Sequence, residues 1–181
     1  MTKIAERPAG TFEAARRAMI DSQLRTSGVN EPWVLAAIAR ARATDPAIVL
    51  VLVGDGPLRA ELEARAAALG IADAVRFAGY VPQAETAAWY RTADLFALSS
   101  DFDNSPNVVL EAMASGLPVV AFNYAAAAQL IRDDDNGCLV PFGDDAAFIK
   151  VAARLADDAP RRRWMGERAR HSAGDAGWDG V

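Results

Sequence analysis

Apolar and polar positions alternate in blocks along most of the chain, and the blocks have the lengths of strands and helices. Residues 48–53 are a continuous run of Ile, Val and Leu, which is typical of a parallel strand that helices cover on both faces. A Gly- and Pro-containing turn follows, and a helix is expected over residues 58–69. The same succession recurs and predicts strands over 75–77, 95–98, 118–122 and 137–140 and helices over 85–90, 107–115, 125–131 and 146–157.

Strands that alternate with helices at this spacing indicate βαβ units. We therefore expect an α/β fold, in which helices flank a Rossmann-like, mostly parallel sheet of about five strands. Two further helices are expected before the sheet, the first from Thr11 to about Gly28 and the second from near Pro32. The predicted domains are an N-terminal tail with a helical appendage over residues 1–43 and a sheet domain over residues 44–181.

The composition narrows the classes of function. The chain has 181 residues and a formal net charge of −5, and this acidic balance argues against nucleic-acid binding, which needs a dense basic surface. The basic run 161–163 follows two Asp residues and is interpreted as a solvated helix end in preference to a phosphate-binding patch. The single cysteine, Cys138, excludes an internal disulfide, lies in an apolar run typical of a buried thiol, and favours a reducing compartment.

The longest apolar run, residues 47–53, is too short to span a bilayer. We therefore expect no transmembrane segment and a cytoplasmic location. Peripheral contact with a membrane is left open by this pattern.

A polar loop that leads into a helix is the most informative segment. The loop of residues 99–106 follows a predicted strand, and the helix begins at Asn107. Ligands of open α/β sheets bind beyond the carboxyl ends of the strands, and the first turn of a helix offers unpaired amides to a phosphate. Glu111, one turn along, either accepts hydrogen bonds from a ribose diol or has a polar partner in the core. Asp103 either meets sugar hydroxyls or caps the helix.

The segment from Asn107 to Val120, NVVLEAMASGLPVV, resembles the signature of retaining GT-B glycosyltransferases of the family 4 type. In that family an acidic residue, seven intervening residues and a Glu form the donor-binding element. Asp103 and Glu111 match this spacing, with Asp in place of the usual first Glu. The resemblance implies that Glu111 binds the ribose, that Asp103 binds the sugar ring, and that backbone amides near Asn107 and Val108 hold the diphosphate.

Two other segments are similar to the same family: VLVGDGPLRAELE, which begins at residue 51, and VRFAGYVPQAETAAWYRTADLFALSS, which begins at residue 75. The resemblance implies that Gly54 lies near the donor and that Tyr80 and Val81 flank the base. It also adds Asn104 and Ser105 of the polar loop to the donor-binding residues. The expected ligand is a UDP- or GDP-linked sugar, with no further cofactor and no metal ion.

The chain also departs from the family pattern. No strand and loop with an Arg and a Lys for the diphosphate is predicted before Ile48, and no segment corresponds to an acceptor-binding domain. Residues 12–40 instead resemble the N-terminal helices of protein-L-isoaspartate O-methyltransferases, which suggests a fusion joined near residues 36–44. We expect this chain to supply the donor-binding half for hexosyl or mannosyl transfer to a lipid or glycan acceptor, with an acceptor domain from another chain. The alternative is a non-catalytic module that binds a nucleotide or offers an interaction surface.

Overall fold

The computed structural model describes residues 18–20, 32–99 and 107–175. Strands and helices alternate along these residues. They are β1 (Ala18–Ile20), α2 (Pro32–Thr44), β2 (Leu50–Val53), α3 (Arg59–Ala68), the 3-10 helix η1 (Ala72–Ala74), β3 (Val75–Gly79), α4 (Gln83–Thr92), β4 (Phe96–Leu98), α5 (Asn107–Ala114), β5 (Val119–Phe122), α6 (Ala125–Leu130), β6 (Gly137–Val140), α7 (Asp145–Asp157) and α8 (Ala159–Asp175).

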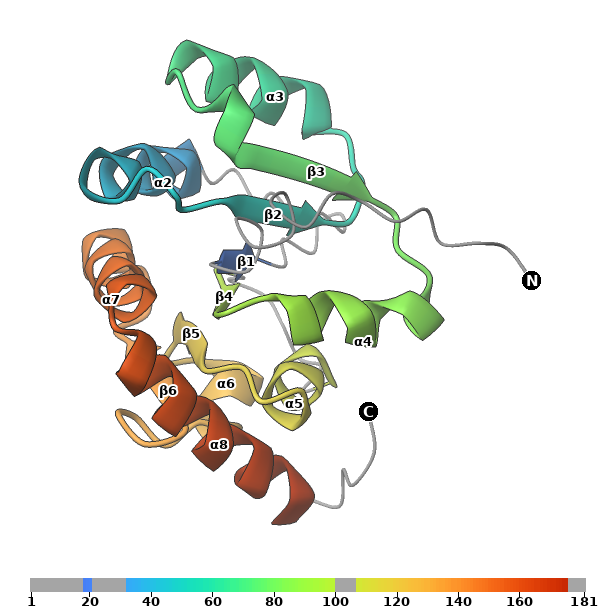
Figure 1. Ribbon diagram of the computed structural model, residues 1–181, viewed down its shortest axis with the longest axis vertical. Coiled ribbons are helices and arrows are strands. Elements are labelled where there is room, and N and C mark those ends of the chain that lie inside the picture. Colours follow the sequence, from blue (N-terminus) through green and yellow to red (C-terminus); the bar gives the residue numbers. More distant parts are fainter. Residues whose placement is uncertain (1–17, 21–31, 100–106, 176–181) are drawn as a thin grey trace.

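The strands form one six-stranded sheet in the order β3-β2-β1-β4-β5-β6, and every neighbouring pair is parallel (Figure 1). This order confirms the predicted α/β, Rossmann-like fold. Between residues 48 and 157 the predicted strands and helices lie where the pattern of apolar runs placed them, within a few residues at each end, whereas η1 and the long helix α8 were not predicted. The sheet has six strands where about five were expected, because one strand comes from the N-terminal segment.

That additional strand, β1, lies in the middle of the sheet. The helix predicted from Thr11 onwards is therefore wrong at Ala18–Ile20, where Met19 pairs with Val51 of β2 on one side and with Phe96 of β4 on the other. Without β1, the facing backbone groups of β2 and β4 would be left unpaired in the interior. This pairing outweighs the helical spacing of the local apolar residues. The other residues of the predicted helix lie outside the described part of the chain.

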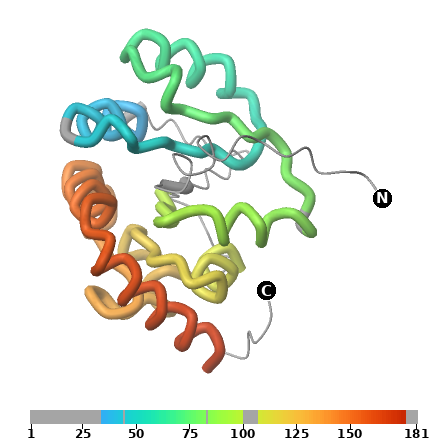
Figure 2. Tube along the Cα trace, in the orientation of Figure 1, coloured from blue at the N-terminus to red at the C-terminus, as the bar shows by residue number. Residues whose placement is uncertain are grey.

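Helices cover both faces of the sheet and so make three layers (Figures 1 and 2). Successive side chains of a strand point to opposite faces. One face carries Leu50, Leu52 and Val120 and packs under α2, α3 and α7. The other carries Phe96 and Val119 and packs under α4, α5, α6 and α8.

Helix α2 belongs to this core although it precedes the boundary predicted at residue 44. Its residues Val34, Leu35 and Ile38 are buried in the same cluster as the strands. The boundary itself stays a prediction. None of the described helices has the length and low charge that a membrane crossing requires.

Candidate functional site

The order of the strands places a candidate site beside β1 and β4. From β1 the chain proceeds outward to β2 and β3, and it then returns to β4 on the other side of β1. Such a reversal opens a crevice at the carboxyl ends of the two strands. Helix α5 follows β4 and begins at Asn107, so its first turn lies at this crevice. Asp103, Asn104 and Ser105 fall in residues 100–106, outside the described part of the chain, and their roles stay predictions.

Helix α5 is anchored by one apolar face and leaves its first turn accessible. Val109, Ala112 and Met113 are buried in the cluster that packs against the sheet, whereas Asn107 is exposed and Val108 is half-buried. The first amides of a helix lack partners within the helix and carry partial positive charge. The first turn of α5 therefore carries amide donors. That the amides of Asn107 and Val108 hold a diphosphate stays a prediction.

Glu111 lies one turn into α5 and is half-buried. The hydroxyl of Tyr90 in α4 donates a hydrogen bond to its carboxylate. Burial raises the pKa of Glu111 above its usual value, and the hydrogen bond from Tyr90 opposes that rise. One carboxylate oxygen thus has a partner on the protein, and the side chain keeps part of its surface open.

Tyr90 is the contact that sequence reasoning missed. The apolar spacing of α4 predicted a core residue, and Tyr90 is indeed buried, with its ring edge-on to Phe96 at 5.6 Å between centroids. Its hydroxyl, however, donates a hydrogen bond to Glu111 of the neighbouring helix. The only available signal was general: a buried tyrosine hydroxyl needs a hydrogen-bond partner.

Gly54, Tyr80 and Val81 meet at the carboxyl ends of β2 and β3, on the same edge of the sheet. The N–H of Gly54 donates to the carbonyl of Gly79 at 2.9 Å, and Gly54 has a φ of 127°, which only glycine adopts readily. Tyr80 follows directly and is 79% exposed, whereas Val81 is half-buried. The structure thus brings these residues to one corner of the predicted site. Their contact with a base stays a prediction.

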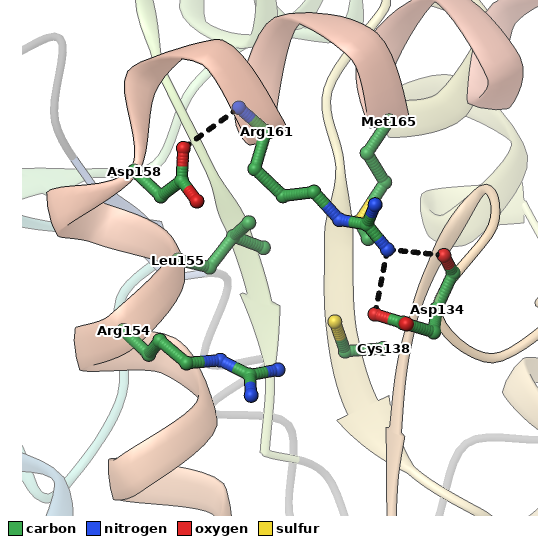
Figure 3. Close-up of a pocket in the computed structure, with 7 residues that line it drawn as sticks. All are labelled: Asp134, Cys138, Arg154, Leu155, Asp158, Arg161 and Met165. Atoms are coloured by element: carbon green, nitrogen blue, oxygen red, sulfur yellow. Dashed lines mark hydrogen bonds and ion pairs between the residues drawn. The ribbon is translucent and has the colours of Figure 1, made fainter.

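A cavity of about 300 Å³ lies beside β6, the outermost strand on the side of the sheet away from β3, between α7, α8 and the start of β6 (Figure 3). Arg161 binds the carboxylate of Asp134 at 2.7 Å, and its backbone N–H donates to Asp158 at 2.9 Å. Arg162 donates to the carbonyl of Leu155 at 3.0 Å and is 11% exposed, so the predicted solvated helix end is wrong for this residue. These contacts join the end of α7 to the start of α8, and we assign no ligand to the cavity. Its lining residues are Asp134, Cys138, Arg154, Leu155, Asp158, Arg161 and Met165.

Comparison with protein-family models matches residues 24–158 to the family described as glycosyl transferases group 1. A D-inositol 3-phosphate glycosyltransferase of Thermomonospora curvata is 36% identical over 155 residues, which are 81% of this chain and 36% of that protein. The lipopolysaccharide core biosynthesis glycosyltransferase LpsE of Rhizobium meliloti is 34% identical over 135 residues, or 75% of this chain and 38% of that protein. The chain thus spans little more than a third of the length of these relatives.

Solved structures of glycosyltransferases share the fold. The C-terminal domain of a group 1 family protein, LpcC of Francisella tularensis, has a TM-score of 0.76 at 20% identity, with 87% of this chain and 84% of that chain covered. Anabaena HepE in complex with UDP and glucose has a TM-score of 0.75 at 22% identity, with 92% and 46% covered. Nothing in these comparisons supports the methyltransferase resemblance of residues 12–40, and the family match includes residues 24–40 of that segment.

Proposed function

Because the chain belongs to the group 1 glycosyltransferases, we propose that it binds a nucleotide sugar and forms the donor-binding half of a retaining glycosyltransferase. One observation carries this proposal. Glu111 stands one turn from the start of α5, half-buried and held by Tyr90, at the point where the strand order reverses.

The proposed geometry divides the donor among three parts of the carboxyl edge. The base lies by Tyr80 at the end of β3, the ribose diol donates to Glu111, and the diphosphate receives hydrogen bonds from the first amides of α5. The helix start would stabilise the negative charge that develops on the leaving diphosphate, in the manner of an oxyanion hole. This arrangement assigns charge stabilisation to backbone amides, and Asp103 would contact the sugar ring.

Similar proteins indicate which nucleotide base and which acceptor to test first. HepE binds UDP and glucose, which makes UDP the first ligand to test and GDP the second. The two relatives named above act in lipopolysaccharide core synthesis or on D-inositol 3-phosphate, so we propose hexosyl or mannosyl transfer to a glycan or lipid acceptor. An acceptor-binding domain would complete the enzyme. We propose a cytoplasmic location, with peripheral membrane contact during transfer to a lipid.

Isothermal titration calorimetry of the chain with UDP, UDP-glucose, GDP and GDP-mannose tests binding. We expect one of the two nucleotide series to bind. Glu111→Gln should weaken that binding by tenfold or more, because a hydrogen bond to a charged group contributes about 1.5–3 kcal/mol. Glu167→Gln is the matched control, since Glu167 is exposed on α8, and it should bind as the wild type does.

Two results would count against the proposal: wild-type chain that binds neither series, or a Glu111→Gln variant that binds as tightly as the Glu167→Gln control. A transfer and hydrolysis assay on the same samples then separates catalysis from binding. Binding without turnover, even after addition of candidate acceptor domains, would favour the non-catalytic nucleotide-binding module.

A further inference from the structure

The hydroxyl of Tyr90 is a buried polar group between helices α4 and α5. The tyrosine ring belongs to the same apolar cluster as Phe96 of β4 and Val109 and Met113 of α5, so contacts with two other elements fix its orientation. A buried hydroxyl is costly unless it has a hydrogen-bond partner, and the partner here is the carboxylate of Glu111. A rigid donor thus meets a half-buried side chain at the edge of the candidate site.

This contact determines where the Glu111 carboxylate lies before a ligand binds. A free glutamate side chain samples several rotamers, and ordering them on binding costs entropy. The hydrogen bond from Tyr90 lowers that cost, because the packed ring holds the donor in one place. An ionised carboxylate has about four acceptor positions, so one bond to Tyr90 leaves enough of them for the two hydroxyl groups of a diol. The bond therefore orients Glu111 without occupying it.

Helix α4 also connects this contact to the corner of the site where Tyr80 and Val81 lie. The helix begins at Gln83, close behind that corner, and Tyr90 stands about two turns along it. Helix α4 packs beside α5 (Figure 1). One rigid element thus carries both the segment proposed to lie by the base and the hydroxyl that holds the proposed ribose ligand. Because the base and the ribose of a nucleoside are a fixed distance apart, a common support aligns their two contacts.

We propose that Tyr90 is a positioning residue, which holds the Glu111 carboxylate towards the 2′- and 3′-hydroxyls of the ligand and so makes the site select ribonucleotides over deoxyribonucleotides. This inference rests on the proposed function, in which Glu111 binds the ribose diol. A site with an acceptor aimed at substrate hydroxyls rejects an analogue that lacks them, because the acceptor then loses its partners. Tyr90 is only 1% exposed, so it acts through Glu111 and not by contact with the nucleotide.

The surroundings of Glu111 separate this role from mere packing. Among the described elements that pack against α5, β5 and α6 carry no ionisable side chain, and the charged side chains of α4 are exposed. Helix α8 presents Arg170, which donates to the Ser115 carbonyl at the far end of α5. Burial raises the pKa of Glu111, and the hydrogen bond from Tyr90 favours the ionised form and lowers it. Loss of the hydroxyl should therefore raise the pKa of Glu111 further, whereas looser packing, which admits water, would lower it.

Tyr90→Phe tests the inference, because it removes the hydroxyl and keeps the ring against Phe96. Its matched control is Thr92→Val, which removes from the same helix a hydroxyl that donates to the Trp89 carbonyl at 2.9 Å. Titration calorimetry gives the Kd of each chain for UDP and for 2′,3′-dideoxyuridine diphosphate. The guanosine pair replaces these ligands if the wild type binds GDP.

We expect the wild type to prefer UDP over the dideoxy analogue by about tenfold or more. In Tyr90→Phe the Kd for UDP should rise about three- to tenfold, and the Kd for the analogue should change by less than about twofold. Thr92→Val should keep the wild-type preference. The ratio of the two Kd values within one variant does not depend on the folded fraction of the chain, so partial unfolding cannot imitate the effect.

The pKa of Glu111 supplies a second measurement, which needs no nucleotide. Carboxyl ¹³C NMR of the glutamate-labelled full chain follows it, and Glu111→Gln assigns the signal. The pKa should be higher in Tyr90→Phe than in the wild type and unchanged in Thr92→Val.

The outcomes distinguish this inference from the proposed function. If the wild type binds neither UDP nor GDP, the proposed function fails and this inference fails with it. If the wild type binds a nucleotide but does not discriminate against the dideoxy analogue, or if Tyr90→Phe keeps the full preference, nucleotide binding stands and the inference is wrong. A lower pKa of Glu111 in Tyr90→Phe would also overturn it, since the hydroxyl would then act through packing alone.

Discussion

Replacing Gly166 by alanine should destabilise the protein, although alanine is the better helix former. Gly166 lies in α8 and faces the end of α5. A Cβ atom built there would lie 2.2 Å from the carbonyl oxygen of Gly116 and 3.2 Å from its carbonyl carbon. Close carbon–oxygen contacts across packed helices are about 3.3 Å, so the overlap is about 1 Å. The obstructing atoms are backbone, which cannot rotate away as a side chain would.

Two effects of opposite sign decide how much Gly166→Ala changes the free energy of unfolding. Alanine in place of glycine in a helix interior gains about 1 kcal/mol. Overpacking costs about 1–3 kcal/mol, and an overlap against fixed backbone puts this site at the upper end. The clash therefore wins, and we expect a net loss of about 2 kcal/mol. For a domain of this size that corresponds to a fall in Tm of about 4–8 °C.

Urea and thermal unfolding followed by circular dichroism measure this change. The control is Glu167→Ala, the next residue of the same helix, which is exposed and should alter the free energy of unfolding by no more than about 0.5 kcal/mol. If Gly166→Ala unfolds at the same or a higher urea concentration than the wild type, the close approach of α8 to α5 does not exist as described.

Four further predictions follow from single residues. Asn136→Ala should lower the free energy of unfolding, measured in urea, by about 2–4 kcal/mol. The side chain of Asn136 is buried, accepts a hydrogen bond from the Arg132 amide at 2.7 Å and donates one to the Ser172 hydroxyl at 3.0 Å. A loss of less than about 1 kcal/mol would contradict this prediction. Ala125 has a φ of 45°, in the left-handed region, so Ala125→Gly should raise the free energy of unfolding by about 0.5–1 kcal/mol in the same assay, because relief of the strain exceeds the entropy cost of glycine. Burial raises the pKa of Cys138 to about 11, and the charges of nearby aspartates add to the rise. Ellman's reagent should therefore label Cys138 slowly at pH 8 in the native state and rapidly in urea, and equal rates would refute this prediction. Nucleotide affinity should fall as pH drops through the raised pKa of Glu111, because the ionised carboxylate is the stronger acceptor and takes both hydrogen bonds of the ribose diol. Titration calorimetry of Glu111→Gln should lack this step, which separates it from titration of the nucleotide phosphate.

The main strands and helices between residues 48 and 157 were predictable because their signals are local. Continuous apolar runs gave the buried parallel strands, and Gly and Pro residues gave their ends. β1 was not predictable in this way. Ala18–Ile20 is only three residues long, and its apolar side chains also fit a helical spacing. What makes it a strand is the open position between β2 and β4, and that position exists only once the sheet is assembled.

In the candidate site, too, the parts that are close in sequence were predictable, and the contacts between separate elements were not. The loop, the helix start and Glu111 follow one another in the chain, so their proximity could be deduced from the sequence. Tyr90 reaches the site from another element, through packing between helices α4 and α5. A sequence pattern defines which residues of one element share a face, but it does not give the register of that face against the next element.

Packing against neighbouring helices can hold the short helix α5 in place before a ligand binds. With eight residues it is too short to be stable alone in water, so packing must hold it. At its end, Arg170 of α8 donates to the carbonyl of Ser115 at 3.0 Å, and Gly166 lets the backbone of α8 approach Gly116. In its middle, Glu111 accepts a hydrogen bond from Tyr90 of α4. The helix is thus held at its end and in its middle before a ligand arrives, which lowers the ordering entropy that opposes phosphate binding at its first turn. A change at the α5–α8 contact should therefore weaken nucleotide binding even though it lies at the opposite end of the helix.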